Sequence, residues 1–251
     1  MKLEIFELDS SEKNVLVIAH RGASNLAPEN TLKAFQKAIE LGADYIEFDV
    51  HQSKDGEIII LHDANTFRMT GKSGILKKLT FEELKKLEIG DGEKIPTLHE
   101  LIKLARGKIA LNCEVKVRGL EENLVKILQK ADIIESTIIS SFKNDILLKI
   151  QDIEPRVRLA ALRPSRTQWI TSLISPKKLI KTAVKNQFYA VNPRHFFVNR
   201  KFIERAHNHD LKVFPWTVDS EKKIKKLVKI GVDGIITNNI SRMKNILNQM
   251  N

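Results

Sequence analysis

The chain has 251 residues, of which 42% are hydrophobic, so it can bury one large core and is not disordered over most of its length. Its 42 lysines and arginines exceed its 31 acidic residues by 11 charges, which points to nucleic acid, an acidic membrane surface or a phosphorylated small molecule as partner. The single cysteine, Cys113, excludes an internal disulfide and a multi-cysteine zinc site. The apolar run at residues 15–19 is too short for a signal peptide or a membrane span, so we expect a cytoplasmic protein.

Short β-branched runs alternate with longer amphipathic stretches along the chain, a pattern typical of a parallel α/β fold. The expected strands are residues 15–19, 45–50, 57–61, 109–115, 137–141, 157–161, 188–191, 212–216 and 234–237. The clearest helical stretches are residues 30–41, 80–87, 121–130, 199–209 and 221–230.

The arrangement of these elements favours a TIM-like (β/α)8 barrel over a doubly wound sheet, because no glycine-rich dinucleotide fingerprint follows the first strand. The runs outnumber the strands of such a barrel, and residues 51–57 are too few for a crossover helix. We therefore expect an irregular barrel near its second and third strands. Residues 64–96, with several glycines, are expected to form a small capping insertion at the mouth, and residues 1–251 a single domain.

The first strand ends in His20, Arg21 and Gly22, at the position where barrel enzymes build their sites. A buried histidine is most often a structural hydrogen-bond donor, and that interpretation stands beside a catalytic one for His20. Arg21 favours the functional interpretation because its guanidinium group matches phosphate oxygens, and Gly22 lets a ligand approach the backbone.

Glu47 and Asp49 are two residues apart in an expected strand, so their side chains share one face. Their repulsion must be relieved by protonation, by basic neighbours or by a cation, and oxygen ligands of this kind suit Mg²⁺ or Ca²⁺. The alternative is a solvated strand face.

Glu114 and Lys116 repeat this spacing at the end of another apolar strand. Glu114 is a candidate third ligand of the cation, with Lys116 on an anionic oxygen. A plain ion pair between the two residues is the competing interpretation. Cys113 falls on the opposite face and is expected to pack in the core.

His62 follows the third run and provides a second histidine at a strand end. Two imidazoles near a phosphate and a cation form a general acid and base pair that works near neutral pH. Late in the chain, Trp216 offers an indole to wall a pocket, although core packing is the more common role of tryptophan.

Together these motifs resemble the glycerophosphodiester phosphodiesterase family over nearly the whole chain. The matching segments are residues 20–22, 28–31, 47–50, 54–56, 61–63, 95–98, 114–116, 140–142, 216–218 and 231–237. The resemblance implies a TIM-like barrel related to phosphatidylinositol-specific phospholipases. It also implies a divalent cation, Mg²⁺ or Ca²⁺, and hydrolysis of glycerophosphodiesters to sn-glycerol 3-phosphate and an alcohol.

The resemblance also implies roles for single residues. The expected metal ligands are Glu47, Asp49 and Glu114, the acid and base His20 and His62, and the substrate-binding residues Arg21, Lys116 and Trp216. Which histidine is the acid, and whether His62 is instead a metal ligand, stays open. The insertion matches the family's small substrate-covering subdomain.

The chain departs from the family pattern at two positions. Asn238 stands where the family usually has an acidic residue soon followed by proline, and Ser53 stands where threonine is common. The first departure concerns the floor of the pocket.

Two other functions compete with this interpretation. A lysophospholipase D-type phosphodiesterase acting on lysophospholipids keeps the chemistry and uses the basic surface and the insertion for peripheral membrane contact. A nucleic-acid-binding barrel without catalysis would rely on positive charge alone. The lysines are spread through helices such as residues 221–230 without interleaved aromatic residues, so we expect a small-molecule glycerophosphodiester as partner and no nucleic acid.

Overall fold

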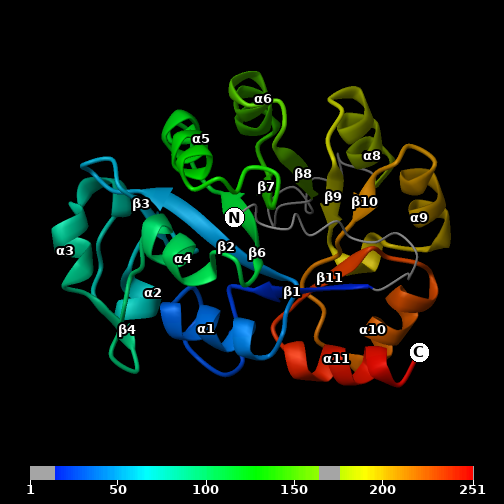
Figure 1. The fold of residues 1–251 in the computed structure, drawn as a ribbon, viewed down its shortest axis with the longest axis horizontal. Coiled ribbons are helices and arrows are strands. Elements are labelled where there is room, and N and C mark those ends of the chain that lie inside the picture. The colour runs from blue at the N-terminus through cyan, green and yellow to red at the C-terminus, as the bar shows by residue number, and fades with distance from the viewer. Residues whose placement is uncertain (1–14, 164–175, 251) are drawn as a thin grey trace.

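The computed structural model describes residues 15–163 and 176–250, which form a barrel of parallel strands surrounded by helices (Figure 1). The barrel strands are β1 (Leu16–His20), β2 (Tyr45–Gln52), β6 (Ala110–Val115), β7 (Thr137–Ser141), β8 (Arg158–Arg163), β9 (Ala190–Pro193), β10 (Lys212–Val213) and β11 (Gly234–Thr237). Their order is β10-β9-β8-β7-β6-β2-β1-β11. Hydrogen bonds from the Asp233 and Ile236 amides to the Val213 and Pro215 carbonyls join the two ends. The predicted TIM-like barrel is thereby confirmed.

Eight helices among the described residues cover the outside of the barrel (Figure 1). They are α1 (Leu32–Glu40), α4 (Leu98–Ala105), α5 (Glu121–Lys130), α6 (Asn144–Ile153), α8 (Pro176–Lys185), α9 (Arg200–His207), α10 (Glu221–Lys229) and α11 (Ile240–Asn248). Thr31, Thr97 and Asn199 begin three of them by accepting a backbone N–H in the first turn. In the ranges that the structure describes, no helix combines the length and apolar character needed to cross a membrane.

The strands are buried on both faces, and the two faces differ in chemistry. Outward side chains such as Ile46 and Phe48 pack against the helices in the main apolar cluster. Inward side chains form a smaller apolar cluster, which contains Leu16, Ile18, Tyr45, Ile138, Ala160, Ala190, Phe214 and Ile236. In β1, β2 and β6 the polar inward residues lie toward the carboxyl end of each strand. The carboxyl ends of barrel strands are where barrel enzymes place their active sites.

The predicted irregularity lies at β3 (Ile58–Ile60), which pairs with β2 in the antiparallel direction and leaves the barrel path. The chain then forms α2 (Phe67–Thr70), a 3₁₀ turn (Leu76–Lys78), α3 (Phe81–Lys85) and the hairpin β4 (Glu88–Gly90) and β5 (Glu93–Lys94). These elements lie together beside the ends of β2 and β3 (Figure 1). They share an apolar cluster of Ile59, Leu61, Leu76, Leu84, Ile89 and Ile95.

The predicted single domain spans residues 1–251, of which 1–14, 164–175 and 251 lie outside the described residues. It stays a prediction.

The turn after β1 is tightly packed against α1. Arg21 and Gly22 adopt left-handed φ values of 56° and 79°, and the Ala23 N–H donates to the Ala34 carbonyl at 2.9 Å. A Cβ on Gly22 would lie 2.7 Å from the Ala34 carbonyl carbon. Gly22 is therefore required both by its backbone conformation and by this close approach.

We expect Gly22→Ala to lower the free energy of unfolding by about 2–4 kcal/mol, since strain and overlap with the backbone add together. Gly71→Ala is the matched control, because Gly71 has a similar φ of 69° but no atom within 4 Å of its added Cβ. It should lose about 1 kcal/mol. Urea denaturation measures both, and equal losses would show that the contact with Ala34 contributes nothing.

Candidate active site

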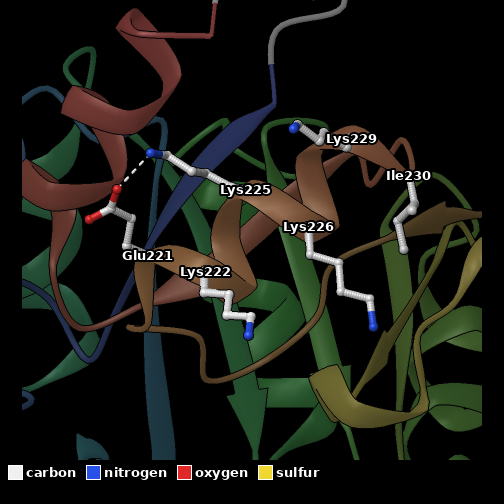
Figure 2. A pocket seen from close by; sticks show the side chains of 6 residues that line it. All are labelled: Glu221, Lys222, Lys225, Lys226, Lys229 and Ile230. Atoms are coloured by element: carbon white, nitrogen blue, oxygen red, sulfur yellow. Dashed lines mark hydrogen bonds and ion pairs between the residues drawn. The ribbon is translucent and has the colours of Figure 1, made fainter.

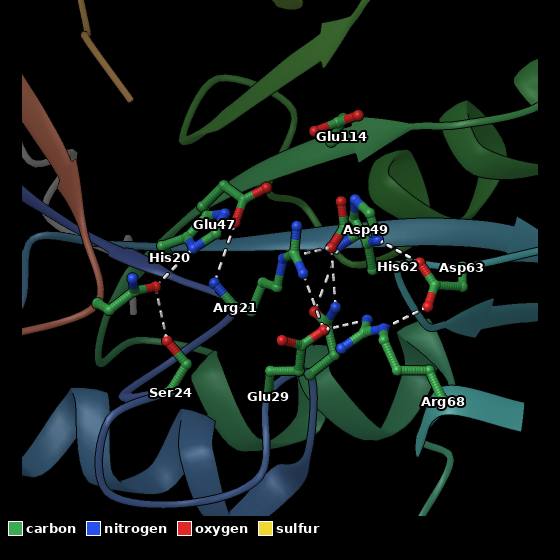
Figure 3. A network of polar contacts seen from close by, with 12 residues as sticks. His20, Arg21, Ser24, Glu29, Glu47, Asp49, His62, Asp63, Arg68 and Glu114 are labelled. Carbon is green, nitrogen blue, oxygen red and sulfur yellow. Dashed lines mark hydrogen bonds and ion pairs between the residues drawn. The ribbon is translucent and has the colours of Figure 1, made fainter. Parts of the chain in front are cut away.

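Strand register brings the three candidate metal ligands together. β2 and β6 are parallel neighbours in which Asp49 pairs with Glu114, and Glu47 precedes Asp49 on the same face. The ligand oxygens of these acids all lie within 4.8 Å of one another, and all three residues are buried. Figure 3 shows the acids above Arg21, on the two adjacent strands.

Asp49 is the most heavily compensated of the three acids. Lys116 Nζ lies 2.8 Å from Asp49 Oδ1 and also bonds Glu114, while Arg21 Nε lies 3.2 Å from Asp49 Oδ2. The Asn30 amide donates to the same Oδ2 at 2.8 Å. Burial alone would raise the pKa of Asp49, but Lys116 and Arg21 hold it well below its ordinary value.

The negative charges of Glu47 and Glu114 are less well balanced by neighbouring positive charges than that of Asp49. Burial, followed by the charges of Asp49 and Glu114, raises the pKa of Glu47 well above its ordinary value. Burial also raises the pKa of Glu114, despite its bond to Lys116. A buried cluster with more carboxylates than neighbouring cations suits a hard divalent cation, so these residues fit the predicted Mg²⁺ or Ca²⁺.

His20 lies at the end of β1, next to Glu47 in register. Its Nδ1 lies 2.7 Å from Asn238 Oδ1. The Asn238 amide nitrogen donates to Asp219 at 2.7 Å, which turns the amide oxygen toward His20. Nδ1 of His20 is therefore the protonated nitrogen, and Nε2 keeps its lone pair. Burial and Arg21 lower the pKa of His20 to about 4, so the ring is neutral at physiological pH.

His62 follows β3 and is held by a chain of charged groups. Its Nδ1 lies 2.6 Å from Asp63 Oδ1, and Asp63 also bonds Arg68. Arg68 lies 2.7 Å from Glu29, which in turn lies 2.8 Å from Arg21 (Figure 3). The insertion is thus tied to the turn after β1 by alternating charges.

An open cavity of about 820 Å³ lies beside His62. His51, Phe67, Arg68 and Lys116 are among the residues that line it with His62. Burial, followed by Lys116, lowers the pKa of His62. The cavity gives a ligand access to both a histidine and a lysine of the site.

A second hollow, of about 660 Å³, lies on the outer helix α10. Its lining residues are Glu221, Lys222, Lys225, Lys226, Lys229 and Ile230 (Figure 2). Lys225 pairs with Glu221 at 2.6 Å, and the lining contains no histidine. With one carboxylate, already paired with a lysine, this hollow does not have the cluster of acids and histidines found at the strand ends.

Two residues that the sequence singled out have other contacts. The Trp216 indole N–H donates to the Asn192 carbonyl at 2.7 Å, and its ring packs edge-on against Phe142 and below Arg194. Trp216 follows β10, which β11 and β1 separate from β2, so its substrate-binding role stays a prediction. The ion pair between Lys116 and Glu114, the competing interpretation, is present.

Sequence reasoning missed the residues that orient the site. Asn30 lies within a matching motif and has a left-handed φ of 58°, but nothing in the sequence indicates that its amide faces Asp49. His51 continues the inward face of Glu47 and Asp49, and its Nε2 contacts the His62 carbonyl at 3.1 Å. The alternation of side chains along β2 could therefore have indicated that His51 faces the site. The contact of Asn238 with His20 joins distant parts of the chain, so no local pattern could have indicated it.

Replacing Glu47 by glutamine should stabilise the metal-free protein at pH 7.5. The raised pKa means that ionised Glu47 opposes folding increasingly as the pH rises above the pKa of glutamate in the unfolded chain. The gain in free energy of unfolding should therefore shrink toward pH 4.5. We expect Mg²⁺ or Ca²⁺ to raise the thermal midpoint of the natural chain, and Glu47→Gln should abolish this rise.

Glu121→Gln is the control for Glu47→Gln, because Glu121 is equally buried but accepts a hydrogen bond from the Gly119 amide outside the cluster. It should not stabilise the protein. Thermal unfolding with chelator and with each cation measures these effects, and a cation response that survives in Glu47→Gln would contradict the assignment.

We expect Asn238→Asp, combined with Asp219→Asn so that two carboxylates do not face each other at 2.7 Å, to raise the pKa of His20 from about 4, because a carboxylate 2.7 Å from Nδ1 stabilises the imidazolium. Ser24→Ala removes a donor to the same Asn238 oxygen without adding charge, so it should shift this pKa little. Histidine NMR titration measures both, and the opposite ranking would refute the contact.

Residues 20–242 match the Glycerophosphoryl diester phosphodiesterase family. The glycerophosphodiester phosphodiesterase of Caldanaerobacter subterraneus subsp. tengcongensis is 36% identical over 245 residues, which cover 92% of this chain and 97% of that protein.

Solved structures of this family share the fold. That of the Thermotoga maritima glycerophosphodiester phosphodiesterase aligns with a TM-score of 0.80 and 28% identity, over 93% of this chain and 98% of that one. That of an Oleispira antarctica phosphodiesterase in complex with the product sn-glycerol-3-phosphate aligns with a TM-score of 0.81 and 27% identity, over 93% and 96%. The chain therefore belongs to the glycerophosphodiester phosphodiesterase family, as its motifs predict.

Proposed function

We propose that this chain hydrolyses glycerophosphodiesters to sn-glycerol 3-phosphate and an alcohol. The observation that carries the proposal is the buried group of Glu47, Asp49 and Glu114 at the end of the barrel where His20 and His62 also lie. The named activity of the Caldanaerobacter relative and the product in the Oleispira structure support it.

The three acids would hold Mg²⁺ or Ca²⁺ through carboxylate oxygens. When bound, such a cation supplies Lewis acidity and neutralises charge on a phosphate oxygen. Because the three acids outnumber Arg21 and Lys116, the ionised cluster would keep a net negative charge that attracts a cation.

Arg21 and Lys116 would stabilise the negative charge that develops on the phosphate. Both are anchored by Asp49, at 3.2 Å and 2.8 Å, so they are positioned before substrate arrives. Preorganised charges of this kind lower the barrier because they do not have to reorient during the reaction.

The histidines would move the protons. Hydrolysis breaks the bond between phosphorus and the alcohol oxygen and forms a bond from phosphorus to the oxygen of water or of the substrate's own glycerol hydroxyl. In the second case the first product is a cyclic glycerophosphate, and water must then open this ring to give glycerol 3-phosphate. One imidazole takes the proton of the nucleophile and the other gives a proton to the leaving alkoxide. Asn238 occupies Nδ1 of His20 and Asp63 occupies Nδ1 of His62, which leaves Nε2 of each ring for these transfers.

The expected partner is a small-molecule glycerophosphodiester in the cytoplasm, and residues 64–96 would wall the cavity on the side of His62. Phe67 and Arg68 of this insertion already line that cavity.

Replacing His20 or His62 by alanine should lower kcat for glycerophosphocholine by about 10²–10⁴-fold, because each change removes one proton transfer. The thermal midpoint should change little. His99→Ala is the control, since His99 is exposed and contacts Glu57 at 3.3 Å outside the site. Release of glycerol 3-phosphate measures turnover.

Chelation should abolish turnover, and adding back Mg²⁺ or Ca²⁺ should restore it. Near-normal turnover in His20→Ala, or full activity in chelator, would refute the proposed function.

A further inference from the structure

The tip of the insertion, defined here as residues 64–81, has an unusual composition. It contains Arg68, Lys72, Lys77 and Lys78 and no aspartate or glutamate. Asn65 and Ile75 form an antiparallel bridge, and the Thr66 hydroxyl donates to the Lys72 carbonyl at 2.5 Å. The tip is therefore an ordered loop whose side chains have defined directions.

Two apolar side chains of the tip are exposed to solvent. Phe67 is 62% exposed and Ile75 is 44% exposed, and the bridge between residues 65 and 75 brings their segments together. Leu76 fills the apolar cluster of the insertion instead. Among the described residues, Phe67 is the most exposed large hydrophobic side chain, so the insertion carries apolar surface that its own core does not use.

Within the tip all charged side chains are positive, and Glu83, which follows the tip, accepts hydrogen bonds from the Thr80 N–H and hydroxyl. Arg68 is offset by Asp63 and Glu29, but Lys72, Lys77 and Lys78 are exposed. The acids of the neighbouring hairpin already have partners. Glu88 lies 3.9 Å from Lys94, and Asp91 lies 3.0 Å from Lys33.

We propose that this tip docks onto an anionic phospholipid bilayer. Exposed phenylalanine and isoleucine insert into the boundary between head groups and acyl chains, while lysines beside them attract anionic head groups. A nucleic acid would use the lysines but leave Ile75 in water. The basic hollow on α10 lacks this combination, since no large apolar side chain near it is as exposed as Phe67 (Figure 2).

Docking at the tip has a consequence for the site. Phe67 lines the cavity that also contains His62 and Lys116. A bilayer bound by Phe67 and Ile75 therefore lies at the entrance of that cavity. The enzyme would meet phosphodiesters where membrane lipids are broken down, while vesicle binding itself requires no hydrolysis.

The test is cosedimentation of the full chain with vesicles of phosphatidylcholine, alone or mixed with phosphatidylglycerol. The natural chain should bind the mixed vesicles and not the neutral ones. The triple variant Lys72→Glu, Lys77→Glu and Lys78→Glu should bind on the order of a hundredfold more weakly. Ile75→Ser should lose about fivefold or more, because it removes apolar contact without changing charge.

The matched control reverses three exposed lysines of α10, by Lys222→Glu, Lys226→Glu and Lys229→Glu. It changes the net charge equally on another face and should reduce binding less than about threefold. Turnover of glycerophosphocholine should be unchanged in the tip variants, which separates failure of docking from failure of the proposed function.

The proposal is overturned if the natural chain does not bind the mixed vesicles or binds neutral vesicles equally well. It is also overturned if the α10 variant loses as much binding as the triple tip variant, or if Ile75→Ser binds as well as the natural chain. Binding to random duplex DNA without vesicle binding would show instead that the lysines recognise nucleic acid.

Discussion

The site depends on a charge imbalance that the barrel holds away from water. Glu47, Asp49 and Glu114 are buried together, with Arg21 and Lys116 as the cations beside them. Two positive groups cannot neutralise three acids, so one acid is held strongly ionised while the pKa of another is raised well above its ordinary value. If the backbone that carries them were flexible, the three acids would repel one another and move apart or into water. The continuous parallel ladder between β2 and β6 supplies the rigidity that keeps the acids together.

Inside the barrel, apolar side chains lie toward one end of the strands and the polar side chains of the candidate site lie toward the other. Ile18 and Tyr45 belong to the apolar inward cluster, whereas His20 and Glu47 continue the same faces two residues later with polar groups. One strand therefore stabilises the barrel at one end and supplies polar groups of the candidate site at the other. Because outward residues such as Phe48 pack in the main apolar cluster, the fold tolerates the unfavourable charges without loss of its core.

Features that follow from local sequence could be predicted, and features that depend on long-range contacts could not. The spacing of Glu47 and Asp49 placed them on one face, and the short connection before β3 indicated that this strand leaves the barrel. The expected role of Arg21 at the phosphate stays a prediction. The ion pairs of Arg21 with Glu29 and Asp49 were not predicted, because these partners come from the turn before α1 and from another strand. Likewise, Asn238 reaches His20 across 218 positions of sequence, beyond any local pattern.

Asn238 also shows how the chain accommodates its departure from the family pattern. The position lacks a carboxylate, but the acid Asp219 binds the Asn238 amide and backbone N–H, at 2.7 Å and 2.8 Å. The Asn238 side-chain oxygen accepts the hydrogen bond from His20 Nδ1 and so orients the ring, without a full negative charge beside it. Because a neutral acceptor stabilises the imidazolium less than a carboxylate does, burial and Arg21 keep His20 neutral. The substitution therefore preserves the tautomer of the histidine while favouring its proton-accepting form.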